Sequence, residues 1–288
     1  MSELLVKHYN SLLAVANALG GNKAGVAHVT TFPSDSVMQN VAKQVGFSET
    51  AFVLTESPEI VFVRFFTPEG EVDLCGHATI AVFSAMQRNT TYTMKTIKAN
   101  LTIRVDGGGR VHMQQSTPTF EPIENPLEVQ EILLSIGLKD TNKEIPITIA
   151  STGLRDIFIP VESSTVLHAL KPNFSRIAEI STQWDTIGMH VYTLHPDDKN
   201  VTAECRNFAP RYAIDEEAAT GSSSGALGAI LVHHHRCPPS TNLVFSQGKS
   251  MQLPSLIGCV VQVDDSNTIT RVEINGIAQE SGQQCIEL

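Results

Sequence analysis

An internal repeat constrains the fold of this chain more than any single motif in it. The segment RFFTP at residues 64–68 is echoed by RNFAP at residues 206–210, with Arg, Phe and Pro identical. Each copy is followed by an acidic stretch, a glycine step and a helix of small residues, and the second spacer is three residues longer. Because coincidence would also have to supply that downstream order, the repeat predicts a duplicated unit. We expect one half at residues 1–120 and the other at 121–288, joined near Pro118–Pro126, with the last strand able to return to the first half.

Short apolar or alternating runs dominate the rest of the chain and are typical of strands. Helical patterns are confined to four segments. The mixture predicts an α+β fold with few, central helices. The expected strands cover Ala51–Leu54, Ile60–Phe66, Leu101–Val105, Ile145–Ala150, Ile157–Val161, Met189–Leu194, Leu243–Ser246, Ile257–Val263 and Thr270–Ile274. The expected helices cover Ser34–Val45, Ala78–Gln87, Leu127–Ile136 and Ser224–His234.

A glycine-rich run, DGGG at residues 106–109, could be mistaken for a phosphate-binding loop. Alternation continues on both sides of it, however, and no helix follows. That context favours a hairpin turn between two strands, Leu101–Val105 and Val111–Gln114.

Charge and cysteine content exclude several classes of protein. The chain has 30 Asp and Glu against 20 Lys and Arg, a net charge of −10, and no basic tract, which argues against nucleic acid as a partner. Polar or charged residues interrupt every apolar run before the roughly 20 residues that a membrane-spanning helix needs. Five cysteines, an odd number without a CxxC pair, indicate reduced thiols and a cytoplasmic location.

The repeated segments have one chemical capacity in common. Each leads from a strand through a turn of glycine and small residues into a helix, whose first backbone N–H groups lack partners within the helix. Two such helix starts could bind the carboxylate of a small molecule without any metal or lysine. The same residues could instead only allow close packing of two backbones, because glycine serves both purposes.

Six blocks, read in order, resemble the phenazine-biosynthesis PhzF-like family. This resemblance implies the fold of diaminopimelate epimerase and proline racemase: two similar halves, each a curved, barrel-like sheet around a central helix, with the active site in the cleft between them. The blocks are GNKAGV at 21–26, SETAFV at 48–53, RFFTP at 64–68 leading to LCGHAT at 74–79, RNFAP at 206–210, EEAATGS at 216–222, and SQG at 246–248 followed by Pro254 and Ser255.

The resemblance also implies proton movement at a carbon next to a carboxylate. Epimerases of this fold use two cysteines, and the matching positions here are Cys75 and Thr220. A threonine hydroxyl is a poor base at neutral pH, so a symmetric two-thiol racemisation is not available. PhzF-like enzymes instead resemble isomerases in which a glutamate removes and returns one proton. That glutamate matches Glu49, which becomes the predicted general acid and base.

The remaining predicted site residues follow the same blocks. His77, at a helix start, is assigned to substrate positioning or proton relay, with helix capping as its alternative role. Glu217 takes the place of the family's aspartate and is one methylene longer. Gly221 and Ser222 are expected to hold the substrate carboxylate. The predicted substrate-binding residues are completed by Cys75, Gly76 and Asn22.

Two departures from the family pattern suggest a different ligand. The usual Gly-Asn-Pro reads GNK at residues 21–23, and the usual Gly-Arg-Pro-Ser reads QLPS at 252–255, which loses an arginine. The histidine run at 233–235 is not expected to bind metal, because adjacent helical positions point in different directions.

Together these features predict a cofactor-independent isomerase that acts on a small carboxylate-bearing metabolite, with no metal, nucleotide or flavin implied. The relatives also suggest a homodimer. Two other functions stay open: a non-catalytic small-molecule-binding protein on the same scaffold, and a racemase or dehydratase with Cys75 as its base.

Overall fold

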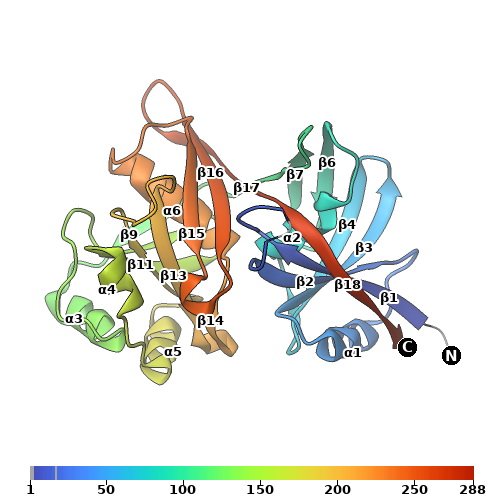
Figure 1. Cartoon of the computed structure of the whole chain (residues 1–288), viewed down its shortest axis with the longest axis horizontal. Coiled ribbons are helices and arrows are strands. Elements are labelled where there is room, and N and C mark those ends of the chain that lie inside the picture. Colours follow the sequence, from blue (N-terminus) through green and yellow to red (C-terminus); the bar gives the residue numbers. More distant parts are fainter. Residues whose placement is uncertain (1–2, 17) are drawn as a thin grey trace. The chain divides into compact units, whose positions relative to one another are not determined.

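The computed structural model describes residues 3–16 and 18–288, which form two compact units (Figure 1). Unit 1 comprises residues 1–114 and 275–288, and unit 2 comprises residues 115–274. Unit 1 therefore contains both ends of the chain, whose first and last strands pair antiparallel from Glu3 opposite Glu287 to Ser11 opposite Ala278.

Unit 1 is a mixed sheet with a regular order of pairing. From β1 to β2, β3, β4, β6 and β7, neighbouring strands are antiparallel, parallel, antiparallel, parallel and antiparallel. Its strands are β1 (Glu3–Ser11), β2 (Asn22–His28), β3 (Glu49–Ser57), β4 (Ile60–Phe66), β5 (Glu71–Val72), β6 (Thr90–Lys95), β7 (Asn100–Val105), β8 (Val111–Gln114) and β18 (Ala278–Glu287), and its helices are α1 (Asp35–Val45) and α2 (Gly76–Ser84).

Unit 2 repeats that order. From β10 to β11, β12, β13, β15 and β16, neighbouring strands are again antiparallel, parallel, antiparallel, parallel and antiparallel. The α+β class and the two similar halves are thus confirmed. The strands are β9 (Thr119–Pro122), β10 (Thr148–Ser151), β11 (Arg155–Val161), β12 (Gly188–Thr193), β13 (Ala203–Ala209), β14 (Ile214–Glu217), β15 (Asn242–Gln247) and β16 (Ser255–Val263), and β17 (Ile269–Gly276) ends in unit 1. The helices are α3 (Pro126–Ser135), α4 (Ser164–His168), α5 (Phe174–Gln183) and α6 (Gly221–His233), with 3-10 turns η1 (Pro210–Tyr212) and η2 (Lys249–Met251).

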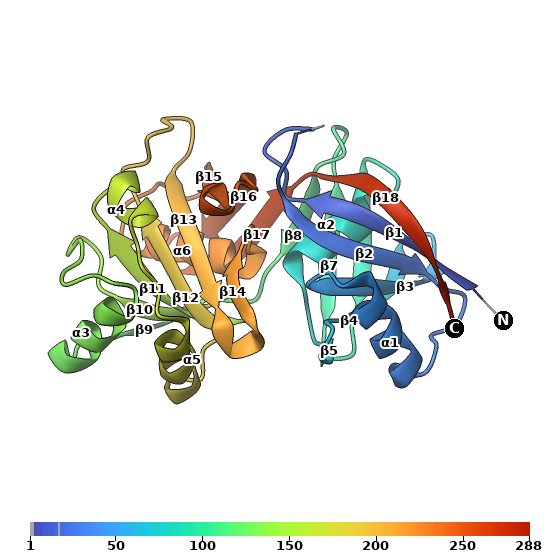
Figure 2. The ribbon, with the colours of Figure 1, turned by 60° about the horizontal axis from the view of Figure 1, so that its bottom comes forward.

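One helix lies inside each unit, as predicted. Helix α2 contacts six strands of unit 1, and α6 contacts β10, β11 and β16 of unit 2; Figure 2 shows strands curving around each helix. Residues 77–83 of α2 and all but one of residues 221–232 of α6 are buried. A helix that is apolar on every side is stable only when it is enclosed in this way.

The outer helices are amphipathic and cover the opposite face of each sheet. Helix α1 begins after Ser34, whose hydroxyl accepts a hydrogen bond from the Val37 amide, and it ends at Gly46 with φ +68°. In unit 2, side chains of β11 alternate: Ile157 packs toward α3, α4 and α5, whereas Phe158 packs toward α6. Even-numbered positions of β11 therefore face the start of the central helix.

The arginine of each repeat has the same structural role. Arg64 makes a bidentate ion pair with Glu71 of β5 at 2.7 and 2.6 Å, and Arg206 makes one with Glu216 of β14 at 2.9 and 2.8 Å. Each guanidinium also lies over the ring of the phenylalanine two residues later, 5.3 and 4.9 Å from the ring centroid. The repeated Arg-x-Phe thus anchors a short strand that leads to each central helix.

The hairpin at residues 106–109 is confirmed. Val105 pairs with Val111, and the Asp106 carboxylate accepts hydrogen bonds from the backbone amides of Gly108 and Arg110, each at 2.9 Å. Gly109 has φ +82°, which favours glycine there. The Asp106 carboxylate thus already binds amides of this turn that a phosphate-binding loop would offer to its ligand.

Several element boundaries differ from the predictions. Helix α6 begins at Gly221, three residues before the expected Ser224, and α2 begins at Gly76, two residues before Ala78. Strand β10 begins at Thr148, three residues later than expected. The glycine steps of both repeats are therefore first turns of helices and not loops.

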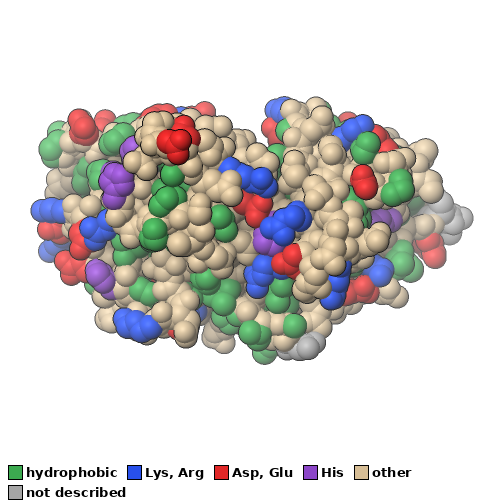
Figure 3. Space-filling view, turned by 90° about the horizontal axis from the view of Figure 1, so that it is seen from above, with side chains coloured by type: hydrophobic (Ala, Val, Ile, Leu, Met, Phe, Trp, Pro, Cys, Tyr) green, Lys and Arg blue, Asp and Glu red, His purple; other side chains and the backbone are tan. Residues whose placement is uncertain are grey.

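The surface carries both signs of charge. On the face drawn in Figure 3, basic and acidic side chains are interspersed. None of the described helices combines the length and the apolar character that crossing a bilayer requires. The five cysteines form no disulfide with one another in the described part of the chain.

Candidate active site

The start of α2 gathers the predicted residues of unit 1. Strands β2 and β3 are parallel, so they begin at the same edge of the sheet, where Asn22 opens β2 and Glu49 opens β3. Helix α2 begins at that edge, with Cys75 as its N-cap residue and Gly76 and His77 in its first turn. The topology therefore brings together residues that lie up to 55 positions apart in sequence.

Glu49 and His77 form a shielded pair. The Oε2 atom of Glu49 lies 3.2 Å from Nε2 of His77, and the two side chains are 12% and 3% exposed. That oxygen is buried and accepts no hydrogen bond from the described residues. An unsatisfied buried carboxylate oxygen is energetically costly, and it is also free to take up a proton.

His77 is held by contacts on both ring nitrogens. The Asn22 amide nitrogen lies 3.3 Å from Nδ1, and the Ser48 hydroxyl lies 3.3 Å from Nε2. In the tautomer in which Asn22 donates to Nδ1, Nε2 carries the proton and faces Glu49. Burial lowers the pKa of His77, against the opposing effects of the Glu49 carboxylate and a backbone hydrogen bond with Lys23. The ring is therefore neutral at physiological pH and can donate to an anionic partner.

Cys75 lies against the same histidine. Its Sγ atom is 3.4 Å from Nδ1 and 3.9 Å from Nε2 of His77, and the residue is 7% exposed. Donor atoms of Glu49, Cys75 and His77 all lie within 4.8 Å of one another, in a group that could hold a metal ion. The cluster thus offers a carboxylate, an imidazole and a thiol at one point.

The start of α6 gathers the predicted residues of unit 2. Glu217 ends β14, and its Oε2 atom accepts a hydrogen bond from the Thr220 hydroxyl at 2.5 Å. Gln247 fixes this turn by donating to the Glu217 carbonyl oxygen at 2.7 Å and to the Thr220 hydroxyl at 3.0 Å, and by accepting from the Thr220 amide at 3.2 Å. Gly221 and Ser222 follow as the first helical residues.

A second carboxylate lies beneath that helix start. Asp156 of β11 is 1% exposed and accepts a hydrogen bond from the Ser223 hydroxyl, while its Oδ1 atom has no partner among the described residues. Burial raises the pKa of Asp156 to about 6, against hydrogen bonds from Ser223, the Gly188 backbone and Asn207. This charge is buried without a counter-ion, so it destabilises the fold when ionised.

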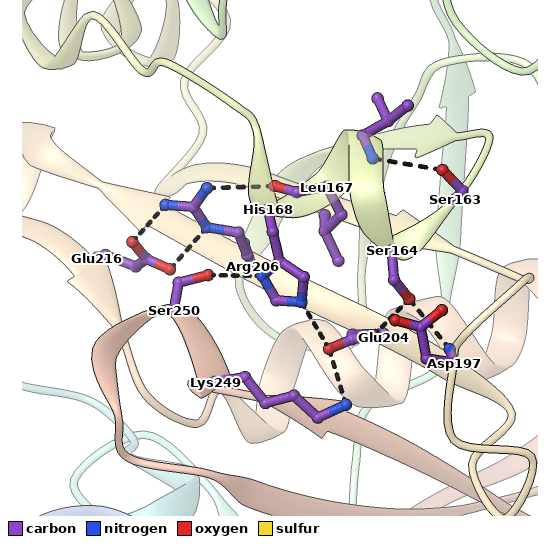
Figure 4. A network of polar contacts seen from close by, with 11 residues as sticks. Ser163, Ser164, Leu167, His168, Asp197, Glu204, Arg206, Glu216, Lys249 and Ser250 are labelled. Carbon is purple, nitrogen blue, oxygen red and sulfur yellow. Dashed lines mark hydrogen bonds and ion pairs between the residues drawn. The ribbon is translucent and has the colours of Figure 1, made fainter.

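A polar network supports the turn that follows Gln247 (Figure 4). Glu204 of β13, with a side chain only 1% exposed, pairs with Lys249 at 2.9 Å and lies 3.0 Å from His168 Nε2. The other nitrogen of His168 lies 3.1 Å from the Ser250 hydroxyl. Two contacts therefore hold η2, one to β13 and one to α4, immediately after the glutamine that holds the Glu217 turn.

Sequence reasoning missed three residues of these clusters. Ser48 and Gln247 lie within blocks quoted for the family resemblance, so their position was a usable signal, although the sequence does not reveal their contacts. Asp156 is a lone carboxylate before an apolar run, which is the pattern of an ordinary strand end. Its burial depends on which face of β11 meets α6.

Comparisons with known proteins agree with the fold. Residues 15–282 match the model of the family described as phenazine biosynthesis-like protein. The chain is 32% identical to "Uncharacterized isomerase YddE" of Escherichia coli O157:H7, over 90% of both chains. It is 27% identical to trans-2,3-dihydro-3-hydroxyanthranilate isomerase of Pseudomonas chlororaphis, over 98% of this chain and 99% of that protein.

Solved structures give the same result. The structure of a Bacillus anthracis phenazine biosynthesis protein of the PhzF family superposes with a TM-score of 0.89 at 26% identity, over the whole of both chains. A hydroxyproline epimerase from Agrobacterium vitis superposes with a TM-score of 0.66 at 12% identity, over 99% of this chain and 93% of that one. The second likeness concerns the fold alone.

Proposed function

The chain belongs to the phenazine biosynthesis-like protein family and is an isomerase, and on that premise we propose that it moves one proton between two carbons of a small carboxylate-bearing substrate through Glu49. The carboxylate of Glu49 accepts the proton from one carbon. The electron pair of the broken C–H bond shifts the neighbouring double bond, and the Glu49 carboxylic acid returns the proton to a second carbon. No external oxidant or cofactor enters this balance.

One observation carries the proposal: the buried Oε2 atom of Glu49 has no hydrogen-bond partner among the described residues and lies beside a neutral imidazole. A carboxylate neutralised by lysine or arginine would hold a proton poorly. His77 can instead stabilise the ionised form by donating one hydrogen bond, and it can release that bond when Glu49 is protonated. This exchange lets one oxygen act as base and then as acid.

The other predicted residues have binding roles in the proposal. Asn22 orients His77, as its 3.3 Å contact with Nδ1 supports. Gly76 contributes a first-turn amide at the α2 start, and Gly221 and Ser222 contribute theirs at the α6 start, where anionic groups are favoured. Glu217, fixed through its hydrogen bond from Thr220, orients a polar group of the substrate.

The test is the exchange of substrate hydrogen in ²H₂O, measured by NMR for wild type and Glu49→Gln. The first substrate to try is trans-2,3-dihydro-3-hydroxyanthranilate, named for the relative, followed by other small unsaturated carboxylates. We expect Glu49→Gln to abolish exchange and turnover while an unreactive carboxylate analogue still binds. Glu56→Gln is the matched control, since it changes a half-exposed glutamate on the same strand.

Unimpaired exchange in Glu49→Gln would refute the role of Glu49. Binding of carboxylates by the wild type without any exchange would instead favour the non-catalytic binding protein.

The Cys75-based racemase or dehydratase has one observation in its favour, which is the 3.4 Å contact between Sγ and His77 Nδ1. Unit 2 offers Thr220 where a second thiol would be needed, and its hydroxyl is engaged by Glu217. Loss of activity in Cys75→Ser, with Glu49→Gln active, would favour this mechanism.

A further inference from the structure

Cys75 takes no part in the proposed proton transfer, yet its sulfur lies within 3.9 Å of both ring nitrogens of the histidine that contacts the proton carrier. We propose that Glu49, Cys75 and His77 form a binding site for a thiophilic divalent cation, best suited to Zn²⁺, and that the bound cation inhibits the enzyme. The inhibitory effect rests on the proposed function of Glu49, whereas the binding does not. The cation is an inhibitor here and not a cofactor.

Two of the three donor atoms, those of Glu49 and His77, are close to the spacing that a zinc ion requires. With Nε2 as the donor of His77, the distances are 3.9 Å to Cys75 Sγ and 3.2 Å to Glu49 Oε2. Tetrahedral zinc with ordinary bond lengths places sulfur and nitrogen roughly 3.6 Å apart, and nitrogen and oxygen roughly 3.4 Å apart. The Oε2 atom is therefore near its bonding position. The Sγ atom lies nearer Nδ1 than Nε2, so Cys75 must rotate about its Cα–Cβ bond to reach a cation on Nε2.

The donor types select the metal. Thiolate and imidazole favour Zn²⁺ over Mg²⁺ or Ca²⁺, which require oxygen ligands. A carboxylate and a thiolate together balance the charge of a divalent ion, and the thiol proton leaves to solvent on binding. Three protein donors leave a fourth position for water, as in zinc sites that remain open to a ligand.

Surrounding groups would orient the ligands. When Nε2 binds metal, Nδ1 carries the ring proton, so the Asn22 amide, 3.3 Å away, must turn its oxygen toward Nδ1 to accept that hydrogen bond and fix the ring. The Ser48 hydroxyl, now 3.3 Å from Nε2, would have to yield that contact to the cation. A cation bound to Oε2 occupies the one oxygen that the proposed mechanism uses, so proton transfer stops.

Unit 2 provides an internal comparison. The residues at the equivalent positions are Thr220 for Cys75, Ser222 for His77 and Gly188 for Glu49. A hydroxyl pair without a carboxylate is a poor ligand set for zinc. The proposal therefore predicts one site per chain, in unit 1.

The test is titration of chelator-treated, full-length protein with Co²⁺ and Zn²⁺. A bound thiolate gives Co²⁺ an intense charge-transfer absorption, so we expect that band with a stoichiometry of one. Cys75→Ser should remove the band and weaken Zn²⁺ binding, measured by calorimetry, by at least about tenfold. Cys285→Ser, a change to an exposed cysteine of β18, is the matched control and should keep both.

A second variant is needed because Cys75→Ser could lose metal binding simply by failing to fold. Glu49→Gln should keep the thiolate band and weaken Zn²⁺ binding, and melting curves of both variants confirm that they fold. Zn²⁺ should also inhibit hydrogen exchange of the substrate in the wild type, with recovery after a chelator is added. Absence of cobalt binding, or binding whose spectrum Cys75→Ser leaves unchanged, would overturn the proposed site.

The two proposals can fail separately. If Glu49→Gln abolishes exchange and no cobalt–thiolate band forms, the metal site is wrong and the proton carrier stands. If the band forms and Glu49→Gln remains active, the metal site stands and the proposed function is wrong.

Discussion

The starts of α2 and α6 share one backbone plan and differ in chemistry. The repeat defines which residues correspond. Thr50 pairs with Phe66, and Met189 pairs with Phe208, which is the same position of the second repeat. The residues just before them, Glu49 and Gly188, are therefore equivalent. In the neighbouring parallel strand, Ala24 then corresponds to Asp156. Unit 1 therefore has its carboxylate, Glu49, on β3. Unit 2 has its carboxylate, Asp156, on β11, which is the parallel neighbour of the strand equivalent to β3.

The framework around these differences is the same. The Thr79 hydroxyl donates to the Cys75 carbonyl oxygen at 2.7 Å, and the Ser224 hydroxyl donates to the Thr220 carbonyl oxygen at 2.8 Å. In both helices, the side chain four residues after the N-cap residue therefore donates a hydrogen bond to the carbonyl oxygen of that N-cap residue. The comparison teaches that the two units share the geometry of the helix start, while single positions decide which half has a carboxylate at the place of Glu49.

The largest expected effect comes from Gly188→Ala. A Cβ atom there would overlap the carbonyl oxygen of Phe208, so position 188, the counterpart of Glu49, cannot hold a side chain. We expect a loss of about 4 kcal/mol or more in the free energy of unfolding of unit 2. Calorimetric melting of the whole chain, which reports on both units, measures this loss and the effect of the control below.

Gly70→Ala is the control, because a Cβ atom there meets nothing within 4 Å, and it should change stability by less than about 0.5 kcal/mol. Equal stability of the two variants would show that the absence of a side chain at position 188 has no steric cause.

The next effect separates the roles of His77 and Ser222, which occupy the same position of their helices. His77→Asn should lower kcat about 10³-fold, because in the proposed function His77 assists the proton transfer itself. Ser222→Ala should mainly raise KM, by about tenfold, because in the proposed function Ser222 binds the substrate. Steady-state kinetics of both variants measures kcat and KM separately. A comparable fall in kcat for both would contradict the proposal that unit 1 transfers the proton and unit 2 binds the substrate.

Asp156→Asn should make stability less dependent on pH. The folded pKa of Asp156 is about 6 and its ordinary value is 3.8, so folding favours the protonated form. The stability that this protonation contributes is complete below pH 3.8 and is lost as pH rises through 6. A shift of about 2 pH units corresponds to about 3 kcal/mol, and we expect the variant, with imperfect hydrogen bonding, to gain about 2 kcal/mol at pH 8.

Denaturant unfolding at pH 4 and pH 8 measures this difference. Ala24, the counterpart in unit 1, cannot ionise, so Ala24→Ser should show no such pH-dependent change. If Asp156→Asn is less stable than wild type by the same amount at both pH values, the claim that ionised Asp156 destabilises the fold is wrong.

The smallest effect tests the shared bracing. Thr79→Val and Ser224→Ala each remove one buried hydrogen bond to a helix-capping carbonyl, at a cost of about 1 kcal/mol each. Calorimetric melting should give values within about 0.5 kcal/mol of one another. A cost confined to one of the two would mean that the helix starts are braced differently.

The repeat made the two-fold organisation predictable, whereas the first turn of α6 was not. Residues 221–224 read GSSS, and glycine and serine favour turns over helix interiors. Tertiary contacts override that preference: Thr152 donates to the Ser222 carbonyl oxygen at 3.1 Å, and Ser223 donates to Asp156. Helix α6 therefore begins three residues earlier than the sequence indicates.

The second repeat predicts a strand at its start, but the apolar pattern does not give the bounds of β13, for a similar reason. This strand buries Glu204 and Arg206, whose charges break the apolar pattern that marks a buried strand. Both charges are neutralised by distant partners, Lys249 and Glu216, which no local pattern reveals.

For the candidate site, the resemblance gave Glu49, His77 and Glu217, and the structure gives their partners. Ser48 and Gln247 act through contacts between segments that are 29 and up to 30 residues apart. Such contacts follow from strand order and not from local residue type.

The most direct test of the proton carrier is a crystal structure of the wild-type protein with 3-hydroxyanthranilate, a stable aromatic carboxylate related to the substrate named for the relative. A reacting carbon should lie roughly 3–3.5 Å from Oε2 of Glu49, the separation expected before proton transfer. A ligand whose ring carbons contact Cys75 Sγ and leave Glu49 untouched would contradict the account.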